Sequence, residues 1–142
     1  MHRYTKTSAF ATRTGRCAAA IAAFSVITIT GWAAFLDGAK WNITVTPDKA
    51  AIDRGEKEFR DTVTFADGKL SSATFLAKGF KPGAYRGEEE ANEAEFEVEL
   101  TGASNSVVNW LGEIRDTNIV GRLTWTKVDG TNLMFNFQGT KQ

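Results

Sequence analysis

Residues 107–142 read VVNWLGEIRDTNIVGRLTWTKVDGTNLMFNFQGTKQ, and this stretch decides the fold. It divides into three segments of alternating apolar and polar residues, 107–114, 119–126 and 133–140. Short runs rich in Asn, Asp and Gly separate these segments. Such alternation between turn residues is typical of antiparallel strands joined by tight turns, so the stretch predicts a three-stranded meander.

Five further segments with a strand pattern precede the meander, and the fourth of them is weak. The clearest is 94–100, where Phe96, Val98 and Leu100 alternate with three glutamates. Because successive side chains of a strand point to opposite faces, this segment has one apolar face and one wet face, which is typical of an antiparallel sheet. The five predicted strands are 41–46, 58–65, 70–78, 84–86 and 94–100.

The connections between these segments also have recognisable patterns. Asp67-Gly68 predicts a hairpin turn, because both residues tolerate the positive φ that such a turn requires. Residues 49–54 predict one or two helical turns, with Asp48 as the N-cap and Gly55 as the stop. The acidic run at 87–92 is expected to be a solvated loop.

The number of strands favours a closed structure. An open meander of this size would expose two unpaired edges, and closure into a barrel removes them. We therefore expect an all-β fold, an antiparallel up-and-down meander that closes into an approximately eight-stranded barrel. A two-sheet sandwich is the alternative.

Residues 1–36 differ from the rest of the chain. They contain four basic residues and no acidic residue, and residues 17–36 are uncharged and mostly apolar. A basic segment followed by an apolar one is typical of a secretory signal, and the same apolar length is just enough for an uncleaved membrane anchor. We expect 1–36 to be a signal peptide or anchor and 37–142 to be one exported domain, periplasmic or extracellular. Membrane contact is expected only through 17–36, if that segment is not cleaved.

The composition of residues 37–142 argues against several classes of function. This part contains 13 basic and 17 acidic residues, a net charge of −4, which argues against nucleic-acid binding. Cys17 and His2, the single cysteine and histidine, both precede it. It therefore lacks an internal disulfide, thiol or imidazole metal ligands and a Ser-His or Cys-His nucleophile. We expect no enzymatic activity, no metal and no cofactor.

One acidic residue is expected to face inward among aromatic residues, and this is Asp61. Burial would raise the pKa of its carboxyl and suit it to act as a general base. The competing interpretation is a rim position, or hydrogen bonds from neighbouring Ser and Thr residues.

Large aromatic residues are expected to face the interior of the barrel. Three tryptophans fall on faces with other apolar residues, and an indole ring suits both a pocket wall and a packed core. The two alternatives, a ligand cavity or a filled core, both stay open. Gly112, Gly121 and Gly139 lie on the same faces and predict bends, or room for a large neighbour or a ligand. The candidate ligand-binding residues are Trp41, Phe59, Phe96, Trp110, Trp125, Phe135 and Phe137.

The first predicted strand opens on Trp41, and Gly38-Ala39-Lys40 directly precede it, so that a glycine comes shortly before a strand tryptophan. With the export signal, the domain size and the order of hairpins, the layout of residues 37–142 resembles the calycin-type barrels, the lipocalin-like and avidin-like group. That resemblance implies a small apolar or amphipathic ligand inside the barrel. The alternatives are an envelope structural or protein-interaction module with a packed core and, third, a small enzyme that uses Asp61.

Overall fold

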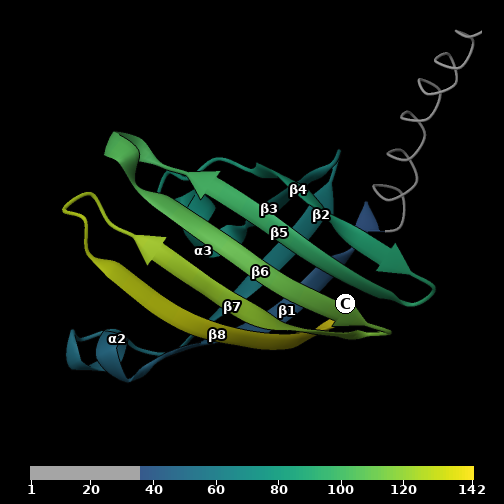
Figure 1. The fold of residues 1–142 in the computed structure, drawn as a ribbon, viewed down its shortest axis with the longest axis horizontal. Helices are drawn as coiled ribbons and strands as arrows, with labels where there is room; N and C mark the ends of the chain where they lie inside the picture. Colours follow the sequence, from purple (N-terminus) through teal and green to yellow (C-terminus); the bar gives the residue numbers. More distant parts are fainter. Residues whose placement is uncertain (1–35) are drawn as a thin grey trace, which may run out of the picture. The chain divides into compact units, whose positions relative to one another are not determined.

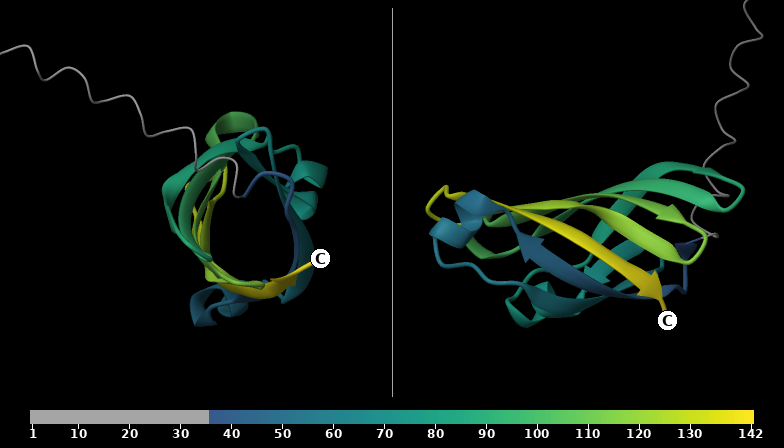
Figure 2. Two further views of the ribbon diagram at one scale, coloured as in Figure 1. Left: turned by 90° about the vertical axis from the view of Figure 1, so that its right-hand side faces the viewer. Right: turned by 90° about the horizontal axis from the view of Figure 1, so that it is seen from below.

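Eight antiparallel strands form a closed barrel in the computed structural model, which describes residues 36–142 (Figure 1). Each strand pairs with the next, and β1 (Lys40–Pro47) pairs with β8 (Asn132–Lys141) to close the ring. Figure 2 shows this closure along the barrel axis. The predicted up-and-down barrel is therefore confirmed over the two-sheet alternative. The expected signal or anchor lies outside the described residues, apart from Leu36.

The other strands follow the alternation in the sequence closely. In β5 four buried residues alternate with exposed ones, and the glutamates Glu95, Glu97 and Glu99 lie outside. The predicted strand with one wet face is thus confirmed, because each inward apolar residue leaves its neighbours pointing to solvent. The remaining strands are β2 (Phe59–Ala66), β3 (Lys69–Ser72), β4 (Gly83–Glu90), β5 (Glu93–Thr101), β6 (Val107–Arg115) and β7 (Asn118–Thr126).

A short helix, α2 (Lys49–Asp53), connects β1 to β2, as the sequence predicts. The Asp48 carboxylate caps it by accepting a hydrogen bond of 2.8 Å from the backbone N–H of Ala51. Gly55 follows with φ of +95°, a conformation that favours glycine. A 3₁₀ turn, η2 (Ala103–Asn105), lies between β5 and β6.

The predicted strand at 70–78 is wrong beyond Ser72. The chain turns there into a second helix, α3 (Ala73–Ala77). The Ser72 hydroxyl accepts a hydrogen bond of 3.1 Å from the backbone N–H of Phe75, which satisfies a donor of the first helical turn. Residues 73–77 have no clear two-residue alternation that would favour a strand, and the Ser72 cap stabilises a helix there instead.

The expectation of a solvated acidic loop at 87–92 is also partly wrong. Strand β4 extends to Glu90, well beyond the weak prediction at 84–86, and the turn is confined to 91–92. Gly87 pairs with Phe96 and Glu89 pairs with Ala94 of β5. Pairing with the strongest strand in the chain overrides the poor strand propensity of the acidic run.

The barrel has two distinct ends. We call one the α3 end: it contains α2, α3, η2 and the turn between β7 and β8 (Figure 1). We call the other the Gln142 end: it contains the start of β1, the turns at 67–68, 91–92 and 116–117, and the C-terminus. The apolar core lies between these ends.

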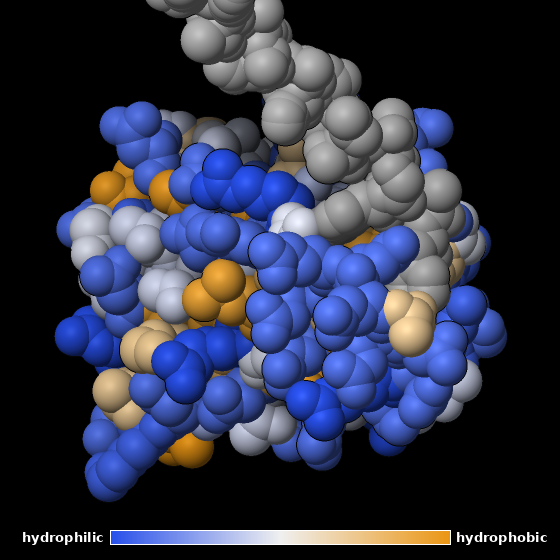
Figure 3. Space-filling model, turned by 45° about the vertical axis from the view of Figure 1, so that its right-hand side comes forward, coloured by the Kyte–Doolittle hydropathy of each residue, from blue (hydrophilic) through white to orange (hydrophobic). Residues whose placement is uncertain are grey.

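The face drawn in Figure 3 is mainly hydrophilic where it is coloured, with apolar residues scattered over it. Among the described residues, no helix is long and apolar enough to cross a membrane.

Candidate functional site in the barrel interior

The seven candidate residues come from six strands and all face the interior. Trp41, Phe96, Trp110, Phe135 and Phe137 are buried, whereas Phe59 and Trp125 are half-buried and pack against the core. The fold therefore brings these residues to the inner surface of the barrel wall, as both a pocket and a packed core require.

The α3 end is filled by aromatic side chains around Phe75, a residue that the sequence analysis did not select. Its ring lies 5.3 Å from both Phe80 and Trp125, measured between ring centroids. It also lies 6.2 Å from Trp110 and 6.4 Å from Phe59. All four contacts are edge-to-face, the geometry that aromatic quadrupoles favour. Helix α3 thus inserts an aromatic plug into its end of the barrel.

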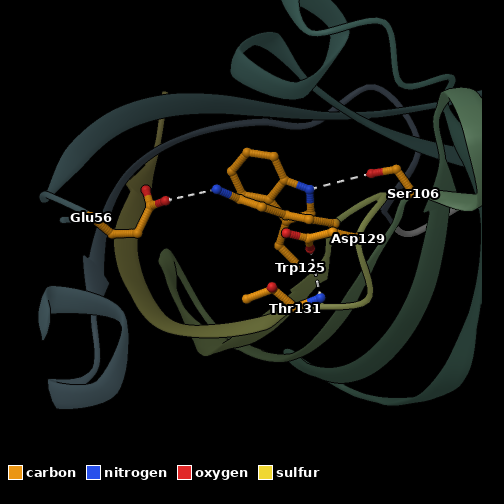
Figure 4. Close-up of polar contacts among 6 residues, drawn as sticks. Glu56, Ser106, Trp125, Asp129 and Thr131 are labelled. Atoms are coloured by element: carbon orange, nitrogen blue, oxygen red, sulfur yellow. Dashed lines mark hydrogen bonds and ion pairs between the residues drawn. The ribbon is translucent and has the colours of Figure 1, made fainter. Parts of the chain in front are cut away.

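Trp125, half-buried beside this plug, is drawn with its polar neighbours in Figure 4. Its indole N–H donates a hydrogen bond of 3.4 Å to the Ser106 hydroxyl. The Lys127 ammonium lies 4.7 Å from the centre of the ring and forms an ion pair of 3.2 Å with Glu56. The polar requirements of this tryptophan are therefore met within the protein.

In the middle of the barrel, two of the glycines lie beside phenylalanine rings. A Cβ at Gly112 would collide with the Phe96 ring and lie 3.0 Å from Phe137, and a Cβ at Gly121 would also collide with Phe137. Gly112 and Gly121 are directly paired in the sheet. These glycines therefore make room for large neighbours, as one of the two interpretations predicts, and the Phe96 and Phe137 rings occupy that room.

The other two described tryptophans differ from Trp125. Trp41 is 2% exposed and Trp110 is fully buried. The indole nitrogen of each is buried, yet neither finds a hydrogen-bond acceptor among residues 36–142. An unsatisfied buried donor costs roughly 1–3 kcal/mol, and native structures satisfy most such groups with protein, water or a ligand. The interior thus presents two N–H donors that have no protein partner.

The Gln142 end holds a cluster of polar groups that includes Asp37, Tyr85 and Glu89. The buried Tyr85 phenol donates a hydrogen bond of 3.2 Å to Asp37. Burial first, then the charge and hydrogen bond of Asp37, and then the charge of Glu89 raise the pKa of Tyr85 well above its ordinary value of 10.0. Tyr85 is therefore a neutral phenol. The Oε2 atom of Glu89 is buried and has no hydrogen-bond partner.

Asp61 is buried and faces inward, as predicted from the sequence. Its carboxylate accepts hydrogen bonds from the backbone N–H groups of Thr62 (2.8 Å) and Thr74 (2.9 Å) and from the Ser72 hydroxyl. Neighbouring Ser and Thr residues thus supply its partners, as the second of the two interpretations predicts.

Within residues 36–142, no cluster of three or more Asp, Glu, His or Cys side chains is arranged to hold a metal ion. No protein-family model, curated protein or solved structure matched the chain in three comparisons. The architecture itself, an eight-stranded antiparallel closed barrel, is consistent with the calycin-like layout.

Sequence reasoning missed Phe75, Phe80, Tyr85 and Glu89 as interior residues. For Tyr85 and Glu89 a signal exists, since Tyr85, Gly87 and Glu89 occupy every second position of a strand once its pairing with β5 is known. For Phe75 the only local signal is a serine three residues before it, the spacing of an N-cap.

Proposed function

We propose that this protein binds a small amphipathic ligand in the interior of its barrel. The observation that carries the proposal is the pair of buried indole N–H donors, on Trp41 and Trp110, that find no acceptor in the described part of the chain. The contrast with Trp125, whose indole donates to Ser106, shows that this chain can supply a partner where it needs one. Small-molecule sites are mainly apolar and use a few polar groups to orient the ligand.

The ligand's place follows from what fills the rest of the interior. The Phe75 plug occupies the α3 end, and the Phe96 and Phe137 rings narrow the middle. The unpartnered groups belong to residues near the start of β1, near the end of β4 and within β6. The proposed site therefore lies at the Gln142 end, to which Trp41 and Glu89 belong, whereas Trp110 packs against the Phe75 and Phe137 rings.

Two measurements test the proposal. Native mass spectrometry of protein purified from its own host would detect a retained ligand. In titrations, N-phenyl-1-naphthylamine, an apolar dye that fluoresces when shielded from water, is expected to bind and to be displaced by 1-decanol, whose oxygen can accept an indole hydrogen bond. We expect Trp41→Phe to weaken decanol binding by about 0.5–1.5 kcal/mol, the net value of one hydrogen bond.

Trp125→Phe is the matched control, because its indole already has a protein acceptor and lies outside the proposed site. It should leave decanol binding unchanged. A protein that carries no ligand from its host and neither binds the dye nor responds to decanol would rule out interior binding.

A second candidate function is an envelope structural or interaction module with a packed core. The observation in its favour is the filling of the space beside Gly112 and Gly121 by phenylalanine rings. On this interpretation the buried indoles are only a cost of packing, and no apolar probe changes the thermal unfolding midpoint. A rise in that midpoint with probe concentration would favour the ligand-binding function, because a ligand that binds the folded state stabilises it.

Export and the lack of catalysis also belong to the proposal. Export rests on the basic and apolar pattern of residues 1–36, and the mass of the mature chain tests it. The absence of enzymatic activity stays a prediction; it is supported by the full set of hydrogen bonds at Asp61, which leaves this carboxylate engaged in structure. Turnover that is lost in Asp61→Asn while the fold persists would overturn it.

A further inference from the structure

We propose that the interior site selects neutral amphiphiles whose head group both donates and accepts hydrogen bonds, such as an alcohol or a carboxamide, and rejects carboxylates. This inference rests on the proposed ligand-binding function and specifies its ligand class. Its basis is the sign of the charge on the groups that face the interior, and whether those groups donate or accept hydrogen bonds.

The carboxylate of Glu89 supplies the acceptor. Glu89 alternates along β4 with Gly87 and the buried Tyr85, so its side chain starts from the inner face of the wall. Its Oε2 atom is buried and has no hydrogen-bond partner within the residues that the structure describes. A nearby candidate donor is already engaged, because the Tyr85 hydroxyl donates to Asp37. A ligand at this position gains by donating a hydrogen bond to Glu89.

The indole N–H of Trp41 supplies a donor at the same end of the barrel. Trp41 is the second residue of β1, and Glu89 is the second-last residue of β4. In an antiparallel meander the start of the first strand and the end of the fourth lie at the same end, so both groups belong to the Gln142 end. A hydroxyl or carboxamide can pair with either group, because each can both donate and accept a hydrogen bond.

The charge around this site excludes an anionic head group. Among residues 36–142, the buried charged side chain is Asp61, and Glu89 is half-buried. Every described lysine and arginine is exposed except Lys127, which lies at the α3 end and pairs with Glu56. A ligand carboxylate would therefore enter a site that presents the carboxylate of Glu89 and, among the described residues, no inward cation. Burying an unpaired charge is strongly unfavourable.

The test compares two ligands of equal chain length that differ in the head group. The full-length chain is loaded with N-phenyl-1-naphthylamine, and 1-decanol or decanoate is added below its micelle concentration. We expect decanoate to displace the dye about tenfold or more less effectively than decanol, the penalty for an unpaired buried charge. This comparison needs only the wild-type protein.

Two variants then test the role of Glu89. Glu89→Gln removes the charge and keeps the shape of the side chain. It should therefore reduce the difference in dye displacement between decanol and decanoate. Glu88→Gln removes an exposed charge one residue away and should leave the difference unchanged. Circular dichroism confirms that each variant folds.

The possible failures are distinguishable. Equal or stronger displacement by decanoate would overturn the proposed selectivity while interior binding stands. A difference that Glu89→Gln does not change would overturn the role of Glu89. Absence of dye binding and of any response to decanol would overturn the proposed function itself, and this inference with it.

Discussion

The buried carboxylate of Asp61 accepts a hydrogen bond from the hydroxyl of Ser72, and that hydroxyl in turn accepts one from the backbone N–H of Phe75. A second bond of 2.9 Å runs from the Thr74 N–H to Asp61. Strand β2 thereby fixes the first turn of α3, whose Phe75 ring plugs the barrel. An acid that sequence analysis proposes as a catalytic candidate is thus a positioning element of the fold.

Asp61→Ala should therefore destabilise the protein, because it leaves the Ser72 hydroxyl and two backbone donors without their acceptor. We expect a loss of about 2–4 kcal/mol in the free energy of unfolding, measured by urea denaturation. Asp53→Ala is the control: it removes an exposed carboxylate from the Lys49 ion pair and should cost less than about 0.5 kcal/mol. Equal effects of the two changes would contradict the proposed role of Asp61.

Gly112→Ala should destabilise the barrel by overpacking. The added methyl group would collide with the Phe96 ring, and the expected cost is about 1–3 kcal/mol in the free energy of unfolding. Phe96→Leu in the same chain should recover part of that loss, because it shortens the colliding side chain. If the two substitutions are simply additive in a double-mutant cycle, the contact does not carry the effect.

Tyr85 should ionise only well above the ordinary phenol pKa. Burial and the neighbouring carboxylates of Asp37 and Glu89 favour the neutral phenol in the folded state, so its folded pKa is raised above the unfolded value of about 10. The stability from this group is then complete below pH 10. It is lost as the pH rises from there through the folded pKa.

An absorbance titration of the phenolate measures this shift. The difference between wild type and Tyr85→Phe isolates Tyr85 from Tyr4, the other tyrosine of the chain. Asp37→Asn should move the Tyr85 transition to lower pH, because it removes the largest of the neighbouring charge effects. A Tyr85 transition at the ordinary value in wild type would show that its environment is not the one described.

Asp48→Ala should cost about 1 kcal/mol in the free energy of unfolding, because the Ala51 N–H loses its capping acceptor. Asp48→Asn should recover most of that loss, since an asparagine side chain caps equally well. The measurement is again urea denaturation. A loss of the same size in both variants would indicate that charge, and not capping, is responsible.

The barrel could be predicted because its strands alternate cleanly. Phe96, Val98 and Leu100 mark the inner face of β5 without ambiguity, and similar patterns mark β1 and β6 to β8. Closure followed from the edge argument, and the α2 cap at Asp48 followed from local chemistry. These features depend on neighbours in sequence or on one repeating pattern.

The features that were missed depend on partners distant in sequence. Helix α3 is secured by Asp61, which lies on another strand, and β4 owes its length to β5. The candidate aromatic residues were found because large apolar residues on inner faces are visible in sequence. The difference between the tryptophans was not visible in the sequence. Trp41 and Trp110 lack acceptors while Trp125 has one, and this depends on the position of Ser106 across the sheet.

The barrel ring has a weak seam between β3 and β4. These strands pair through two residue pairs, Lys69 with Ala84 and Leu70 with Gly83, whereas β6 and β7 share nine. A ladder with so few hydrogen bonds opens at a lower free energy than the rest of the sheet. Amide hydrogen exchange at this seam should therefore outpace exchange in β6 to β8. Transient separation of β3 and β4 would give a solute a lateral route to the interior, and both ends of the barrel would stay closed.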